Sequence, residues 1–202
     1  FQGIFCDGIH QYSDQSFYFY YEYNQTIQYF KNLDLTPFIR INLSDIIHAH
    51  IDMAQAEETL TIFLQTMSKY FSKSYVEEWL FEIMHFDDIS TQQYLCFYEI
   101  FYQKIRKFSD KIQLGIFSVN QTSKSLLERF RSELLFCHKK KYIPDFITFK
   151  VEPNIKKDDS LGLQIESHKQ LKDHHTDMIE KIQQIIAGCG LTKIPLYAIE
   201  WN

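Results

Sequence analysis

Apolar residues along the 202-residue chain follow two alternating patterns. Short runs rich in Phe, Ile, Val and Leu are followed by longer stretches in which apolar residues recur every three or four positions. Tyr94, Phe97, Tyr98, Phe101 and Ile105 have the second spacing and would form one face of a helix. The short runs therefore predict strands, and the longer stretches predict helices.

The two patterns can be placed along the chain. The short runs predict six strands, at residues 3–5, 37–43, 79–84, 114–119, 145–151 and 196–201. The longer stretches predict five helices, at about 24–33, 55–72, 91–108, 123–140 and 170–188. Ser90 and Ser123 are expected N-caps, and Gly188 and Gly190 are expected to close the last helix. The polar stretch 154–173 is expected to be a long surface loop.

Strands that alternate with helices of this length predict βαβ units and a parallel sheet. Continuously apolar strand interiors agree with a sheet that is covered on both faces. A doubly wound sheet and a (β/α)₈ TIM barrel both fit. The sequence contains no glycine-rich strand-to-helix turn, which counts against a dinucleotide-binding or P-loop fold. A full barrel has eight strands over about 250 residues. A barrel here would therefore be incomplete, and residues 1–202 would form one domain.

Composition narrows the classes of function. The net charge of −5 argues against direct nucleic-acid binding by this segment. No apolar run approaches the roughly 18 residues of a membrane span. The four cysteines match no zinc module and suit a reducing cytoplasm. His48, His50 and Asp52, like the run KDHHTD at 172–177, complete no known ligand pattern, so we expect neither metal nor cofactor.

Candidate chemistry lies where strands end, because functional residues of a barrel sit at the carboxyl ends of its strands. The residues at those ends are Asp7, Asn42, His85, Phe86, Asp87, Lys150, Glu152, Glu200 and Trp201. A carboxylate beside a tryptophan suits a sugar site, because the carboxylate can act on the anomeric carbon while the indole stacks on the ring.

Five blocks, in order along nearly the whole chain, resemble glycoside hydrolase family 39, the family of β-xylosidases and α-iduronidases. The blocks are FQGIFCDG (1–8), LTPFIRINL (35–43), EEWLFEIMHFDD (77–88), PDFITFKVEP (144–153) and GLTKIPLYAIEWN (190–202). The resemblance implies a retaining (β/α)₈ barrel, of which this chain would cover the second to the seventh strand.

The resemblance also implies a degenerate site. It places the family's nucleophile at Glu200, next to Trp201, but it places Phe86 at the acid/base glutamate. Other positions that match the family's site but differ in chemical character are Gln2, His85, Asp87, Lys150 and Val151. Retaining hydrolysis needs two carboxyl groups about 5–5.5 Å apart, and phenylalanine cannot donate a proton. Asp87, Asp88 or His85 would have to replace the missing acid.

Domains that resemble this family but lack the acid glutamate occur in AraC-type transcription regulators. We therefore expect a non-catalytic ligand-sensing or interaction domain, a pseudoenzyme in which Glu200 is vestigial. Its ligand would be carbohydrate-like or another small polar molecule, bound by Gln2, His85, Lys150, Glu200 and Trp201. A separate helix-turn-helix domain would bind DNA, and a homodimer is compatible with exposed sheet edges. The alternatives are a weakly active xylosidase-like glycosidase with a displaced acid and a purely structural dimerisation module.

Overall fold

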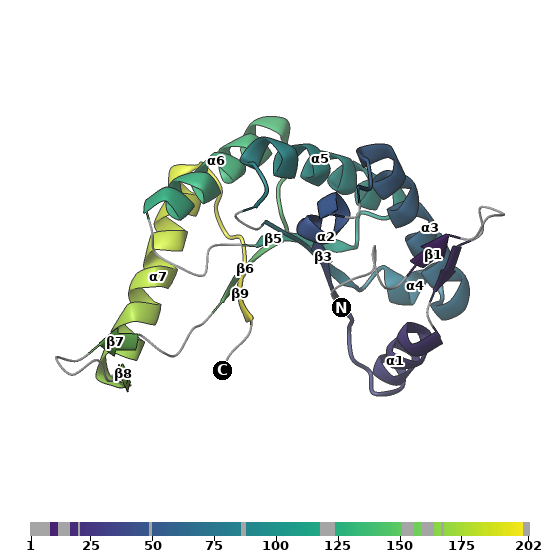
Figure 1. Cartoon of the computed structure of the whole chain (residues 1–202), viewed down its shortest axis with the longest axis horizontal. Helices are drawn as coiled ribbons and strands as arrows, with labels where there is room; N and C mark the ends of the chain where they lie inside the picture. The colour runs from purple at the N-terminus through teal and green to yellow at the C-terminus, as the bar shows by residue number, and fades with distance from the viewer. Residues whose placement is uncertain are drawn as a thin grey trace. The chain divides into compact units, whose positions relative to one another are not determined.

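The computed structural model describes residues 9–11, 17–19, 21–48, 50–85, 88–117, 124–150, 156–158, 164–166 and 168–199. The chain divides into two compact units, Phe1–Phe117 and Ser118–Asn202. Each unit contains short strands and at least one long helix (Figure 1). The predicted strand at 3–5 and the predicted N-cap Ser123 lie outside the described residues.

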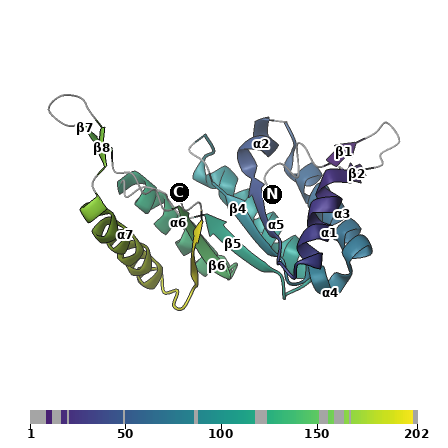
Figure 2. The ribbon, with the colours of Figure 1, turned by 90° about the horizontal axis from the view of Figure 1, so that it is seen from below.

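The first unit is built on three neighbouring parallel strands, β3 (Phe38–Asn42), β4 (Leu80–Met84) and β5 (Gln113–Phe117). Figure 2 shows β4 and β5 side by side. The register pairs Arg40 with Glu82 across β3 and β4, and Glu82 with Gly115 across β4 and β5. These strands confirm the predictions at 37–43 and 79–84 and, over its described part, the prediction at 114–119.

The helices of the first unit include three that were predicted, α1 (Tyr21–Asn32), α3 (Met53–Phe71) and α5 (Thr91–Phe108). Ser90 caps α5 as expected, in a reciprocal capping box with Gln93. Four short elements were not predicted: α2 (Leu43–His48), α4 (Lys73–Val76), and the antiparallel strands β1 (Ile9–Gln11) and β2 (Phe17–Phe19). Each is too short to show a period in its apolar residues.

The core of the first unit lies between the sheet and the long helices. Ile39 and Ile41 of β3 alternate along the strand with Arg40, and both are fully buried. Phe63 of α3 packs edge-on against Phe81 of β4, with ring centroids 6.3 Å apart, and both rings contact Trp79. Burying each such side chain contributes about 1.5–3 kcal/mol. The helices thus cover one face of the sheet, and Arg40 lies on the other.

The second unit contains α6 (Lys124–Lys140), β6 (Phe146–Lys150), α7 (His168–Gly188) and β9 (Leu196–Ile199). Strand β6 pairs in parallel with β9, from Ile147 opposite Leu196 to Lys150 opposite Ile199. These elements confirm the predicted helices at 123–140 and 170–188 and the strands at 145–151 and 196–201 over their described parts. Among the described residues of both units, no helix is long and apolar enough to cross a membrane.

The prediction of a loop over 154–173 was wrong in part. An antiparallel hairpin, β7 (Lys156–Asp158) and β8 (Gln164–Glu166), lies there, and α7 already begins at His168. Both strands are short and mostly polar, so they carry no hydrophobic alternation. The two strands pair with each other, so that each supplies hydrogen-bond partners for the backbone N–H and C=O groups of the other.

In the described part of the chain, four helices end in a Schellman-type turn, in which an N–H bonds to the carbonyl five residues earlier. The residue before that N–H has a positive φ angle in every case. The N–H donors and their carbonyl acceptors, with the positive-φ residue in parentheses, are Leu35 and Phe30 (Asp34, φ 57°), Ile51 and Ile46 (His50, 55°), Tyr142 and Cys137 (Lys141, 61°), and Leu191 and Ile186 (Gly190, 75°). Of these four positions, only position 190 has glycine, the residue that the left-handed conformation favours. The other three turns therefore carry backbone strain.

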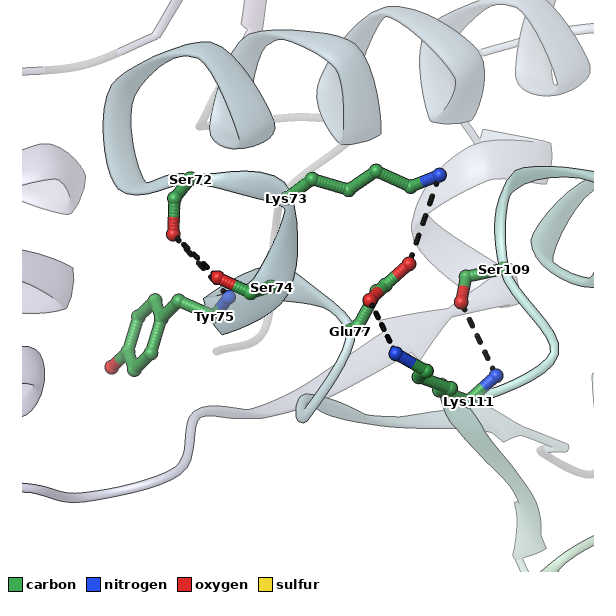
Figure 3. Close-up of polar contacts among 7 residues, drawn as sticks. All are labelled: Ser72, Lys73, Ser74, Tyr75, Glu77, Ser109 and Lys111. Carbon is green, nitrogen blue, oxygen red and sulfur yellow. Dashed lines mark hydrogen bonds and ion pairs between the residues drawn. The ribbon is translucent and has the colours of Figure 1, made fainter.

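A polar cluster lies at the amino ends of β4 and β5 (Figure 3). The Glu77 carboxylate accepts a hydrogen bond from Lys111 Nζ at 3.2 Å and lies 3.7 Å from Lys73 Nζ. The backbone N–H of Lys111 donates to Ser109 Oγ at 3.2 Å. The hydrogen bond from Lys111, followed by that from Ser109 and by the two lysine charges, holds the pKa of Glu77 below its ordinary value. The cluster thus ties α4 to the chain before β5.

We expect glycine to stabilise the end of α6. Lys141→Gly should raise the free energy of unfolding by about 0.5–1 kcal/mol, because the relieved left-handed strain exceeds the entropy that glycine adds to the unfolded chain.

Gly190→Ala, after α7, should lower the free energy of unfolding, since the added Cβ would lie 3.3 Å from the His138 ring at a position with positive φ. Gly188→Ala is the matched control, because no atom lies within 4 Å of its Cβ. Denaturant unfolding that shows equal effects at 188 and 190 would contradict this account.

Glu77 should make stability depend on pH. Because its folded-state pKa lies below the ordinary value of 4.5, its stabilisation is present above that pH and is lost as the pH falls through the folded-state pKa. Glu77→Gln should therefore lower Tm at pH 7 and have a shrinking effect below pH 4.5. Glu78→Gln, one residue further along, is the control. The interpretation fails if the Glu77→Gln effect on Tm is constant between pH 7 and pH 3.

Candidate functional site: the carboxyl edge of β3 and β4

The carboxyl ends of β3 and β4 lie at the same edge of the sheet. Asn42, the last residue of β3, stands opposite Met84, the last residue of β4. Helix α2 begins directly after Asn42, and the loop to α5 begins with His85. This edge is where parallel α/β folds place binding and catalytic groups.

An ion pair lies below this edge, on the sheet face away from the long helices. Arg40 Nε donates to Glu82 Oε2 at 2.6 Å, and the two side chains are 11% and 0% exposed. A buried carboxylate is tolerated only with a partner of opposite charge, and the register supplies one directly across the strand pair. The sequence assigned no chemistry to Glu82, and the structure gives it this structural role.

His85, a predicted ligand-binding residue, is engaged with the protein itself. His85 is buried, with 2% of the residue exposed, and its Nε2 lies 2.8 Å from the carbonyl oxygen of Ile89. Nε2 must carry a proton to donate to that carbonyl. The imidazole stacks on Tyr94, with ring centroids 4.4 Å apart and planes 6° apart, and the Tyr94 hydroxyl donates to the Ile83 carbonyl. His85 thus joins the end of β4 to its loop and to α5. Whether it also binds a ligand stays a prediction.

A second polar group lies at the edge and is solvent accessible. Asn42 Oδ1 accepts from the Ser44 N–H at 3.0 Å, and Ser44 Oγ donates to Asp88 Oδ1 at 2.9 Å. His48 Nε2 lies 3.7 Å from Asp88 Oδ2, and the two side chains are 73% and 44% exposed. No sequence motif connects these residues, because 44 positions separate Ser44 from Asp88.

The histidines of the HAHID stretch do not form a metal site. His48 faces Asp88, His50 occupies the turn after α2, and Asp52 caps α3 in a capping box with Gln55. Among the residues that the structure describes, no group of three His, Cys, Asp or Glu side chains could hold a metal ion.

Most of the other predicted site residues lie outside the described residues: Gln2, Phe86, Asp87, Val151, Glu200 and Trp201. Lys150 is the last residue of β6, opposite Ile199, but its side chain is not among those described. Strand β9 ends at Ile199, directly before Glu200 in the sequence. The convergence of these side chains on one ligand stays a prediction.

Comparison with known proteins identifies the fold but no family. No family model and no curated protein matches the chain. Among solved structures, the chain is similar to a monomeric β-xylosidase from Caulobacter crescentus CB15, with a TM-score of 0.74 and 14% sequence identity. The similarity covers 100% of this chain and 44% of that protein, so the chain spans less than half its length. The fold is thus α/β with parallel strands and TIM-barrel-like, which agrees with the incomplete barrel that we expected.

Removing one partner of the Arg40–Glu82 pair should be costly. Glu82→Ala should lower the free energy of unfolding by about 3–5 kcal/mol, because it removes one member of a buried ion pair. The double variant Arg40→Met/Glu82→Leu should recover most of that loss. Lys104→Met is the control, since its pair with Glu57 is partly exposed and should be worth about 1 kcal/mol or less. A Glu82→Ala effect no larger than the control, in urea unfolding, would refute the structural role.

Proposed function

We propose that this chain is a glycosidase-like domain that binds a carbohydrate or another small polar ligand without hydrolysing it. One observation carries the proposal. Among the described residues around the carboxyl end of β4, the groups that could replace a glutamate at position 86 are either held inside the protein or exposed at its surface. Glu82 pairs with Arg40 and His85 donates to the Ile89 carbonyl, whereas Asp88 accepts from Ser44 at the exposed edge.

The missing acid affects both halves of a retaining reaction. One carboxyl group first protonates the leaving oxygen and later activates the water that releases the sugar. Phe86, at the matched position, can do neither. Loss of general acid–base catalysis typically costs about 10²–10⁴-fold in rate. Glu200, if it serves as nucleophile, could then attack only a sugar with a good leaving group.

The class of ligand is supported by the fold. The similar solved structure is named a β-xylosidase, and its likeness here extends over the whole chain. A site that keeps a barrel's carboxyl edge but lacks the acid suits recognition rather than cleavage. We further propose the setting that the resemblance implies, an AraC-type transcription regulator whose DNA-binding domain is separate. The negative net charge agrees with that division. A cytoplasmic location and a homodimer stay predictions.

Hydrolysis should be absent on natural glycosides. We expect no turnover of xylobiose and at most one equivalent of nitrophenol released from 4-nitrophenyl β-xyloside, because the first step needs little protonation with that leaving group. Glu200→Ala should abolish the burst. Phe86→Glu should not yield an efficient enzyme, since Gln2, Lys150 and Val151 also differ from the family's residues.

Two results would contradict the proposal. Sustained turnover that disappears in Glu200→Ala would make the chain an enzyme, and its loss in Asp88→Ala as well would identify Asp88 as the displaced acid. Failure to bind any of a panel of methyl glycosides in protein-observed NMR titrations would remove the proposed ligand class.

A further inference from the structure

Four polar side chains at the carboxyl edge come from two separate segments. Asn42 and Ser44 lie at the end of β3 and the start of α2, His48 ends α2, and Asp88 follows β4. The Ser44 hydroxyl donates to one Asp88 oxygen at 2.9 Å, and His48 Nε2 lies 3.7 Å from the other. Neither β3 nor β4 alone could assemble this group, which we call the rim cluster.

The rim cluster keeps hydrogen-bonding capacity that the fold does not use. Asn42 Oδ1 accepts from the Ser44 N–H, while the Asn42 Nδ2 group, with two N–H donors, has no hydrogen-bond partner among the described residues. Each Asp88 carboxylate oxygen can accept more than one hydrogen bond, and the side chain is 44% exposed. Accessible donors and acceptors therefore stand close together.

This combination fits neighbouring hydroxyl groups better than it fits an ion. Every sugar hydroxyl both donates and accepts, so a diol can donate to a carboxylate and accept from an amide at once. A metal ion would need more carboxylate or imidazole ligands than the two that Asp88 and His48 provide in this cluster. An anion would meet the negative charge of Asp88.

We propose that the rim cluster of Asn42, Ser44, His48 and Asp88 binds two neighbouring hydroxyl groups of a carbohydrate at the carboxyl edge of β3 and β4. The inference rests on the proposed function for its ligand class. It adds residues that determine specificity, because a sugar lacking one of these hydroxyls would leave an acceptor or donor of the cluster unpaired.

The experiment compares methyl β-xyloside with its 2-, 3- and 4-deoxy analogues by NMR titration of the whole chain. The wild type should bind at least one deoxy analogue about tenfold more weakly, the loss typical of one hydrogen bond to a charged group. Asp88→Ala should bind the parent glycoside about tenfold more weakly and no longer distinguish that analogue. His48→Gln and Asp88→Asn serve as variants of conserved size, and Tm shows that each is folded. Glu78→Gln, at the opposite edge of the sheet, is the control and should change neither affinity nor discrimination.

The outcomes separate this inference from the proposed function. If folded Asp88→Ala and His48→Gln bind and discriminate like the wild type, the rim cluster only holds α2 to the loop after β4, and the inference fails while the proposed function stands. If the wild type binds none of the glycosides, the proposed function fails and the inference fails with it.

Discussion

The ion pair between Arg40 and Glu82 determines how β3 and β4 lie against each other. Successive side chains of a strand point to opposite faces, so a slip of one residue would bring Arg40 opposite Phe81 or Ile83 and separate it from Glu82. A buried carboxylate without a partner costs several kcal/mol, which disfavours every other register. The same register sets Asn42 beside Met84, so both strands end at one level.

The carboxyl edge depends on that alignment. Helix α2 and the loop after β4 start at matching levels, which lets Ser44 reach Asp88. The loop is held from the other side by His85, whose ring lies between the Ile89 carbonyl and Tyr94. His85 at the end of β4 and Asp88 further along the loop are thus each held by contacts to other elements. A polar rim that is held by such contacts is suited to binding by preorganised hydrogen bonds.

The two edges of the sheet differ in what their charges do. At the amino edge, Glu77 pairs with Lys111 and Lys73, and we expect its contribution to be stability. At the carboxyl edge, the Asp88 and His48 side chains remain accessible to solvent. This division is the one expected of barrel-like α/β folds, in which the amino edge carries stability and the carboxyl edge carries function. It supports a search for ligands at one edge only.

The sequence by itself determined the long elements of this protein. Helix α5 spans Thr91–Phe108 as its apolar spacing predicts, because a period over many residues reflects which face is buried. Strand β4 ends directly before His85, as its short apolar run predicts. The short elements α2 and α4 escaped prediction, since capping and local hydrogen bonds rather than period hold them. Only the tertiary structure decided the partners of Glu82, His85 and Asp88. Ser44 and Asp88 carry no signal of their contact along the chain, because it exists only once two strands have aligned in register.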